Sequence, residues 1–222
     1  MTKTQIRKHI VTAIAPLCEA HGYQRMPKRL LYYKIRDGVM SFVLFDGKIA
    51  EFDSGIYVMP LYMPNQTPVL DYGNQIWRMD ICNASRYTLN CDLSEEELVS
   101  HLANIKAYLQ DTGFALLEHF GTPQGVTESV SKKVRPTNFF FTNAKNLHVA
   151  ATFSYFYCGN VKKGQRCYKE LLAILRDPAY GSLPAAEQQA LEQLVGDPSG
   201  AEAILRQIQK ETTSALGLPE TD

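Results

Sequence analysis

The chain has no excess of charge of either sign: 23 basic residues balance 23 acidic residues over 222 positions. Proteins that bind nucleic acid or an anionic membrane through their overall field carry a clear positive excess, so we expect neither partner. The sequence also lacks any run of about 18 apolar residues, which predicts that no helix spans a membrane. The charged first ten residues are not followed by an apolar stretch, so they do not resemble a secretory signal.

Cysteines are few, and their spacing fits neither a disulfide framework nor a metal site. The five cysteines are odd in number, and eight residues separate both Cys82 from Cys91 and Cys158 from Cys167. A zinc-binding loop has about two to four residues between its cysteines. Free thiols without an export signal are typical of the reducing cytosol. We therefore expect a cytoplasmic protein that binds no metal ion and no cofactor.

The sequence also lacks the short motifs of the common enzyme classes. It contains no Gly-x-Ser-x-Gly elbow, no His-Glu-x-x-His helix and no glycine-rich phosphate loop. The string from Phe52 to Gly55 matches the core triplet of aspartic peptidases, but that chemistry needs two aspartates that share one proton. Only one copy is present, so we expect no enzyme. The alternative is an enzyme with a dispersed, hydrolase-like site, for which His21, Asp53 and Asp80 are the candidates.

The first half of the chain predicts a helix followed by an antiparallel meander. Ile6, Ile10 and Ile14 recur on one face of a helix over residues 4–22. The dipeptides Asp37-Gly38 and Asp46-Gly47 then separate runs of β-branched and aromatic residues, which is the strongest short signal for β-hairpins. The predicted strands cover residues 30–36, 39–45, 49–63, 75–82 and 86–91.

The second hairpin predicts a sheet with two apolar faces. If Asp46-Gly47 is a two-residue turn, Phe42 lies opposite Glu51. One face then mixes apolar and acidic side chains: Met40, Phe42, Glu51, Asp53 and Tyr57. Either helices cover both faces, or one face stays open for a protein partner or a second copy of the chain.

The second half of the chain predicts helices in succession. Ser94 and Glu97 form a capping box at the start of a helix that Gly113 ends or breaks, and Phe114–Phe120 is expected as its short continuation. Residues 121–136 are rich in glycine and proline and predict a loop or boundary. Further helices are expected at about 143–158, 161–176, 184–195 and 199–216. Helix, strands and then a run of helices indicate an α+β fold, with an α+β domain over residues 1–120 and a helical region over 121–222 packed on it.

Two segments resemble known families. The helix that ends at His21-Gly22-Tyr23, a strand rich in tyrosine around Tyr33, and the string Met59-Pro-Leu-Tyr-Met-Pro64 before Asp71–Ile76 carry the first resemblance. On these residues, positions 1 to about 120 resemble the bacterial domain-of-unknown-function family 4304, although Gln75 stands where that family usually has a basic residue. Because its members are mostly uncharacterised, the resemblance implies a fold and no reaction.

The second resemblance lies in the helical half. Residues 153–172, with the turn Gly159-Asn160, are similar to one tetratricopeptide-like helical hairpin, with Gly164 at the position that usually holds alanine. No second copy follows at a 34-residue period, and stable arrays need about three repeats. Tyr155 and Tyr157 in its first helix are aromatic residues of the kind found at protein interfaces.

These features favour a non-enzymatic protein-interaction module, with toxin immunity as one specific form. The predicted interaction surface combines the mixed sheet face with the helical hairpin: Met40, Phe42, Glu51, Asp53, Tyr57, Tyr155 and Tyr157. The neutral total also hides a division of charge. Residues 1–36 hold eight basic residues and one acid, whereas residues 37–100 hold three basic residues and ten acids. These opposite blocks either neutralise each other or form a polar surface that orients a partner.

Overall fold

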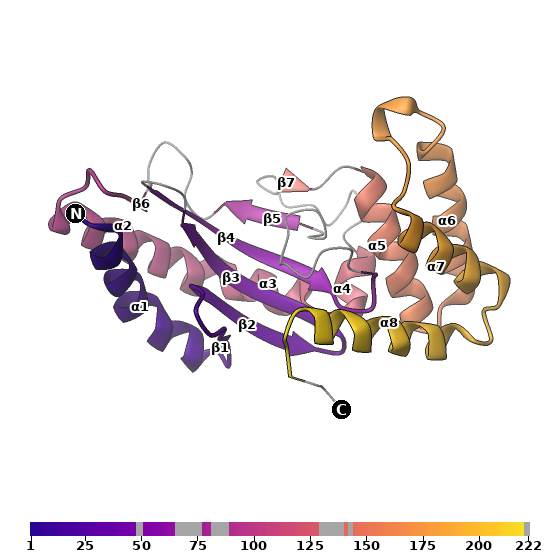
Figure 1. The fold of residues 1–222 in the computed structure, drawn as a ribbon, viewed down its shortest axis with the longest axis horizontal. Coiled ribbons are helices and arrows are strands. Elements are labelled where there is room, and N and C mark those ends of the chain that lie inside the picture. Colours follow the sequence, from indigo (N-terminus) through magenta and orange to yellow (C-terminus); the bar gives the residue numbers. More distant parts are fainter. Residues whose placement is uncertain (48–50, 65–76, 81–88, 129–139, 142–143, 220–222) are drawn as a thin grey trace. The chain divides into compact units, whose positions relative to one another are not determined.

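A computed structural model of the chain describes residues 1–47, 51–64, 77–80, 89–128, 140–141 and 144–219. It confirms the α+β class, with an N-terminal helix, an antiparallel sheet and a helical C-terminal region (Figure 1). The strands are β1 (Gln24–Arg25), β2 (Leu31–Arg36), β3 (Val39–Gly47), β4 (Glu51–Pro60), β5 (Trp77–Asp80), β6 (Leu89–Asn90) and β7 (Phe140–Phe141). The helices are α1 (Lys3–Ala20), α2 (Glu95–Tyr108), α3 (Phe114–Phe120), α4 (Pro123–Glu128), α5 (Ala144–Tyr157), α6 (Val161–Ile174), α7 (Ala185–Gly196) and α8 (Ala201–Ala215).

The chain divides into two compact units, and each is described by itself. Unit 1 comprises Met1–Lys34, Ser41–Tyr57 and Arg78–His119. Unit 2 comprises Ile35–Met40, Val58–Trp77 and Phe120–Asp222. The helices that follow residue 120 therefore share a unit with the β2–β3 turn and with the end of β4.

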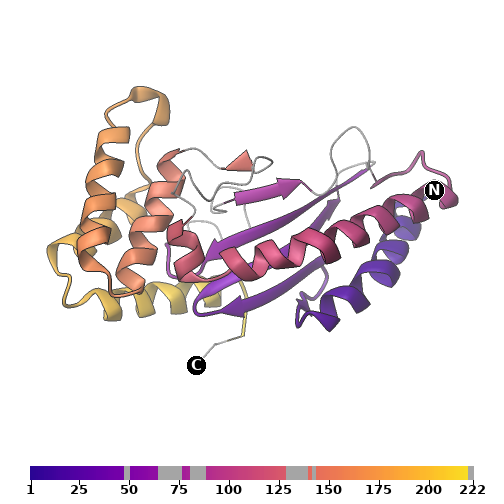
Figure 2. The same ribbon diagram turned by 180° about the vertical axis from the view of Figure 1, so that it is seen from behind.

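In unit 1, α1 and α2 pack against each other and lie on the same side of the strands, as Figure 2 shows from behind. The predicted capping box of α2 is confirmed: Glu97 N donates to Ser94 Oγ at 3.2 Å, and Ser94 N donates to the Glu97 carboxylate at 2.8 Å. The same hydrogen bonds lower the pKa of the Glu97 carboxyl. An equivalent box, formed by Thr2 and Gln5, begins α1. These local hydrogen bonds satisfy amide groups that a helix start otherwise leaves unpaired.

The strand order of the sheet is β1-β2-β3-β4-β5-β7, and β6 also pairs with β4. Its first hairpin turns at Asp37-Gly38 as predicted, with φ of 48° and 71°. Both residues thus adopt the left-handed conformation that two-residue hairpin turns require.

The predicted second turn at Asp46-Gly47 is wrong, because β3 continues through both residues. The connection to β4 falls at residues 48–50, which lie outside the described residues. The Phe42 ring stacks on Tyr57, with centroids 4.9 Å apart, whereas the predicted register places Phe42 opposite Glu51, six residues or about 20 Å from Tyr57. Gly55 makes the stack possible, since a Cβ at this position would lie 2.8 Å from the Tyr57 ring.

In unit 2, α5 and α6 form the predicted helical hairpin. Gly159 has a φ of 70° at the turn, and the Asn160 side chain caps α6 by accepting from Lys163 N. A Cβ on Gly164 would lie 2.8 Å from the Phe156 ring, so the glycine lets the two helices approach closely. The loop predicted over residues 121–136 is wrong in part, because α4 forms within it. Thr122 caps that helix through Gly125 N.

Candidate functional site

The structure places most of the predicted sheet surface inside the protein. Met40 and Phe42 have no exposed surface and Tyr57 has 1%. These three side chains belong to the core, because both sides of β3 are buried along Val39–Phe45. Glu51 is half-buried at the start of β4, and the side chain of Asp53 lies outside the described residues. The sheet therefore offers no open apolar face at these positions.

The two tyrosines of the helical hairpin are half-buried. The ring of Tyr157 stacks on Tyr62 with centroids 4.2 Å apart, and its hydroxyl donates to Gln209 Oε1 at 3.3 Å. Burial raises the pKa of the Tyr157 phenol, and the charge of Asp37 acts in the same direction. Tyr155 lies 6.0 Å from the Lys163 ammonium and its phenol pKa is also raised by burial. Tyr157 thus ties α5 to α8 and is only in part a surface residue.

The residues named for a dispersed catalytic site are not shown to converge. His21 is exposed at the end of α1 and its ring stacks on Phe114 at 3.9 Å. Asp80 is in β5, but its side chain, like that of Asp53, lies outside the described residues. Across the part of the chain that the structure describes, no three His, Cys, Asp or Glu side chains are grouped as metal ligands would be.

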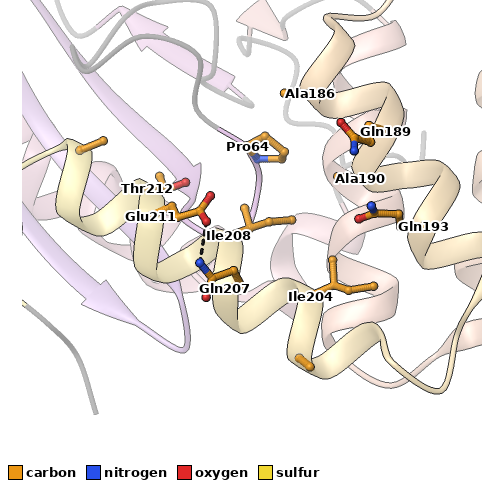
Figure 3. A pocket seen from close by; sticks show the side chains of 12 residues that line it. Pro64, Ala186, Gln189, Ala190, Gln193, Ile204, Gln207, Ile208, Glu211 and Thr212 are labelled. Carbon is orange, nitrogen blue, oxygen red and sulfur yellow. Dashed lines mark hydrogen bonds between the residues drawn. The ribbon is translucent and has the colours of Figure 1, made fainter.

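An open groove lies between α7 and α8 in unit 2, and Pro64 lines it between the two helices, beside Ile208 (Figure 3). Its volume is about 730 Å³. One wall is formed by α7 residues: Ala186, Gln189, Ala190 and Gln193. The other wall is formed by α8 residues: Ala203, Ile204, Gln207, Ile208, Glu211, Thr212 and Ala215. Sequence reasoning predicted both helices but not the groove between them.

The groove has an apolar floor and an amide rim. Ala186 and Ala190 are four residues apart on α7, and Ile204 and Ile208 are four residues apart on α8, so each pair lies on one side of its helix. Glutamines border this apolar strip, and Gln207 Nε2 donates to Glu211 Oε1 at 2.6 Å (Figure 3). Among the described residues of the lining, Glu211 alone carries a charge.

Buried contacts hold α8 in place beside the groove. Thr212 Oγ1 donates to the Met63 carbonyl at 3.0 Å, directly before Pro64 in the chain. One turn earlier, Gln209 accepts the hydrogen bond from Tyr157. The hydroxyl of the fully buried Tyr62, on which Tyr157 stacks, shares a hydrogen bond of 2.7 Å with Ser154 Oγ. The shape of the groove is therefore supported by the core of unit 2.

The sequence of α8 carries one apolar stripe and no separate signal for the groove. Ala201, Leu205 and Thr212 are buried, and Ile204 and Ile208 are half-buried at one margin of the same stripe. On a helical wheel these positions span about 100°, the usual width of a stripe that faces a core. Spacing alone therefore does not reveal the groove.

Comparison of the chain with protein-family models, curated proteins and solved structures finds no match. The resemblances to family 4304 and to a tetratricopeptide-like hairpin stay predictions from the sequence. In the described ranges, no helix has the length and apolar character needed to cross a membrane. The geometry of the groove is therefore the main guide to function.

Proposed function

We propose that the protein is a non-enzymatic protein-interaction module that holds a helical segment of a protein partner between α7 and α8. The observation that carries this proposal is the uncharged apolar floor bordered by glutamine side chains. Apolar grooves between helices accept an amphipathic helix whose apolar residues recur at i, i+3 or i+4, and i+7. The pair of alanines on α7 and the pair of isoleucines on α8 form rows that suit such ridges.

The length of the groove sets the length of the partner segment. Along α8, the lining extends from Ala203 to Ala215, which is about 18 Å at 1.5 Å per residue. A partner helix of about three turns covers this distance. The small side chains of Ala186 and Ala190 on the facing wall leave room for large apolar residues of the partner.

The charge of the lining sets the polarity of the partner. Glu211 stands at the rim of the groove, where it is exposed. A lysine or arginine in the partner helix would pair with this carboxylate, whereas an acidic residue there would be repelled. We therefore expect an amphipathic helix with a basic residue at its edge.

The lining favours binding over catalysis. Its described residues include no histidine, cysteine, serine or lysine, which are the usual nucleophiles and acid–base groups. The hydroxyl of Thr212 is already engaged with the Met63 carbonyl, and Glu211 is exposed. The exposed carboxylate lacks the burial that activates a catalytic side chain.

The proposal is tested first by site-specific photo-crosslinking in the native host. A photoreactive amino acid in place of Gln189 lies in the groove, and the same amino acid in place of Ala173, exposed on α6, is the matched control. We expect a partner protein to crosslink from position 189 and not from position 173. Equal crosslinking from both positions would contradict a docking site in the groove.

The crosslinked segment is then titrated as a synthetic peptide. Ala186→Arg places a long charged side chain into the groove, and we expect it to weaken peptide binding at least about tenfold, or 1.4 kcal/mol. Ala173→Arg makes the same change outside the groove and is expected to stay within about twofold of the wild type. Circular dichroism checks that both variants fold. Undiminished binding by Ala186→Arg would overturn the proposal.

Toxin immunity is the specific form of this function that gene neighbourhood tests. An immunity protein is encoded next to the toxin that it blocks, so a toxin-domain gene directly adjacent supports this form. Occurrence of the gene in related genomes without an adjacent toxin gene counts against immunity. The groove variants then test the more general proposal of a protein-interaction module.

A further inference from the structure

Four cationic side chains gather at one edge of unit 1. Arg7 comes from α1, Arg25 from β1, and Lys28 and Arg29 from the loop that joins β1 to β2. All four are exposed. Arg7 Nη2 donates to the Lys28 carbonyl at 3.0 Å, and Arg25 Nε donates to the Arg29 carbonyl at 3.4 Å. Two arginines from different elements thus converge on one loop, and we call this set the basic cluster.

The loop that carries the basic cluster is held in a defined conformation. Met26 N donates to the Leu31 carbonyl at 2.8 Å and closes the loop at its base. Lys28 has a φ of 64°, a left-handed conformation that costs a side-chain-bearing residue about 1 kcal/mol. Glycine or asparagine adopts this conformation more readily. A lysine at this position therefore presents its charge on a rigid turn at some cost to stability.

No carboxylate of the described residues forms an ion pair with the basic cluster. Glu19, the one acid in residues 1–36, acts electrostatically on the Tyr32 phenol together with Arg7 and Arg25, and it is the acid of α1 to weigh against the cluster. Lys34 belongs to the same basic block of sequence and shows the contrast, because its ammonium lies 2.6 Å from the Glu118 carboxylate. With four cations and no ion pair to a described carboxylate, the cluster keeps an excess of positive charge.

We infer that the basic cluster docks an acidic segment of a protein partner, at a surface separate from the α7–α8 groove. Guanidinium groups bind carboxylates through two parallel hydrogen bonds. Three of the four cations in the basic cluster carry a guanidinium group: Arg7, Arg25 and Arg29. An unpaired cluster gains from a complementary acidic partner both in rate of association and in orientation.

The composition of the cluster favours an acidic protein segment over nucleic acid. Four cations can neutralise only about four phosphate groups, whereas a protein that binds nucleic acid mainly through its phosphates contacts about six to ten of them. Single-stranded nucleic acid also requires exposed aromatic rings for base stacking. Around the cluster, the aromatic residues that the structure describes are buried: Tyr23, Tyr32 and Tyr33.

The test uses the full-length protein and a fluorescein-labelled peptide of twelve glutamates, measured by fluorescence anisotropy at low and at physiological salt. Lys28→Asn with Arg29→Gln removes two charges and keeps the carbonyls that Arg7 and Arg25 bind. We expect this double variant to weaken peptide binding at least about fivefold at low salt. A twelve-residue glutamine peptide is expected not to bind.

Lys162→Gln with Lys169→Gln is the matched control, because it removes the same charge from exposed positions on α6. We expect this control to change the affinity for the glutamate peptide less than about twofold. Ala186→Arg should leave that affinity unchanged, because the proposed surface does not include the groove. Equal losses in the two double variants, or no binding of the glutamate peptide, would overturn the inference. Tighter, cluster-dependent binding of a single-stranded oligonucleotide of equal charge would also overturn it. So would a cluster-dependent dimer in light scattering, since the occupant would then be a second copy of the chain.

Discussion

At the scale of single residues, Glu187 is a carboxyl that α7 buries, with 8% of its surface exposed. Burial raises the pKa of this carboxyl above its ordinary value, and the charge of Lys145 offsets the effect only in part. A group with a raised folded-state pKa stabilises the fold while it is protonated, and this contribution is lost as the pH rises through the folded-state pKa. We therefore expect Glu187→Gln to raise the free energy of unfolding at pH 7 by about 0.5–2 kcal/mol.

Urea unfolding as a function of pH measures this effect. The gain of Glu187→Gln should shrink below pH 4, where the wild-type carboxyl is protonated in both the folded and the unfolded state. Glu192→Gln changes an exposed position on the same helix and is expected to alter stability by less than about 0.5 kcal/mol throughout. A loss of stability in Glu187→Gln at pH 7 would show instead that the ionised carboxyl supports the start of α7.

Residues whose structure depends on near neighbours were predictable from the sequence. Ser94 and Glu97 cap α2 through hydrogen bonds between residues three positions apart, and the turn at Asp37-Gly38 needs only those two residues. Asp46-Gly47 has the same turn chemistry, yet both residues stay in β3. There the stack of Phe42 on Tyr57 and the burial of both strands fix the register, because a shifted register would separate these side chains.

At the scale of elements, the helix that starts at Glu95 contains a π-helical turn at Leu109–Gly113. Its buried side chains recur at spacings of three and four up to Leu109, and the next, Phe114, follows after five. A π turn takes up such an insertion while the apolar stripe continues in phase. The break predicted at Gly113 is therefore a π turn, and the continuation predicted over Phe114–Phe120 is confirmed as α3. The spacing of five was the signal for the turn.

Deleting the exposed Thr112 from this turn tests that explanation. The deletion reduces the spacing between Leu109 and Phe114 to four, which an ordinary α-helical turn accommodates. We expect the free energy of unfolding to stay within about 1 kcal/mol of the wild type, measured by chemical denaturation.

Deletion of Ser100 is the matched control, because it removes an exposed residue from a regular part of α2. It rotates Leu98 by about 100° relative to Leu102, and displacing a buried leucine costs at least about 2 kcal/mol. Equal losses in the two deletions would show that the π turn is required for folding and is not a tolerated insertion.

The groove shows what the pattern of an element leaves open. The periodicity of α7 and α8 predicted both helices to within about two residues of their observed bounds. Whether Ile204 and Ile208 meet another part of the chain depends on the angle between the helices, which contacts distant in sequence determine. Thr212 with Met63, 149 positions apart, is one such contact.

At the scale of the whole molecule, the two units are interleaved along the chain, so neither is a contiguous segment. Tyr62 illustrates the consequence within unit 2: its ring stacks on Tyr157 and its hydroxyl bonds with Ser154. The glycine- and proline-rich stretch after residue 120 predicted a division of the chain at that point. A cut there would separate Tyr62 from both partners, because they follow residue 120 in the chain. The loop signal is local and does not report which distant segments pack together.

We therefore expect a fragment of residues 1–120 to lose the cooperative thermal unfolding of the full chain. Leu61, Tyr62 and Met63 are buried in the whole protein, and without residues 121–222 their apolar surface would be exposed and bind a hydrophobic dye. Adding a separately expressed fragment of residues 121–222 should restore dispersed amide resonances and reduce dye binding, since the missing contacts reform between the fragments. A chain ending at residue 219 is the control and should unfold like the wild type. Sharp, cooperative unfolding of residues 1–120 alone would show instead that the strands are stable without the helices that complete unit 2.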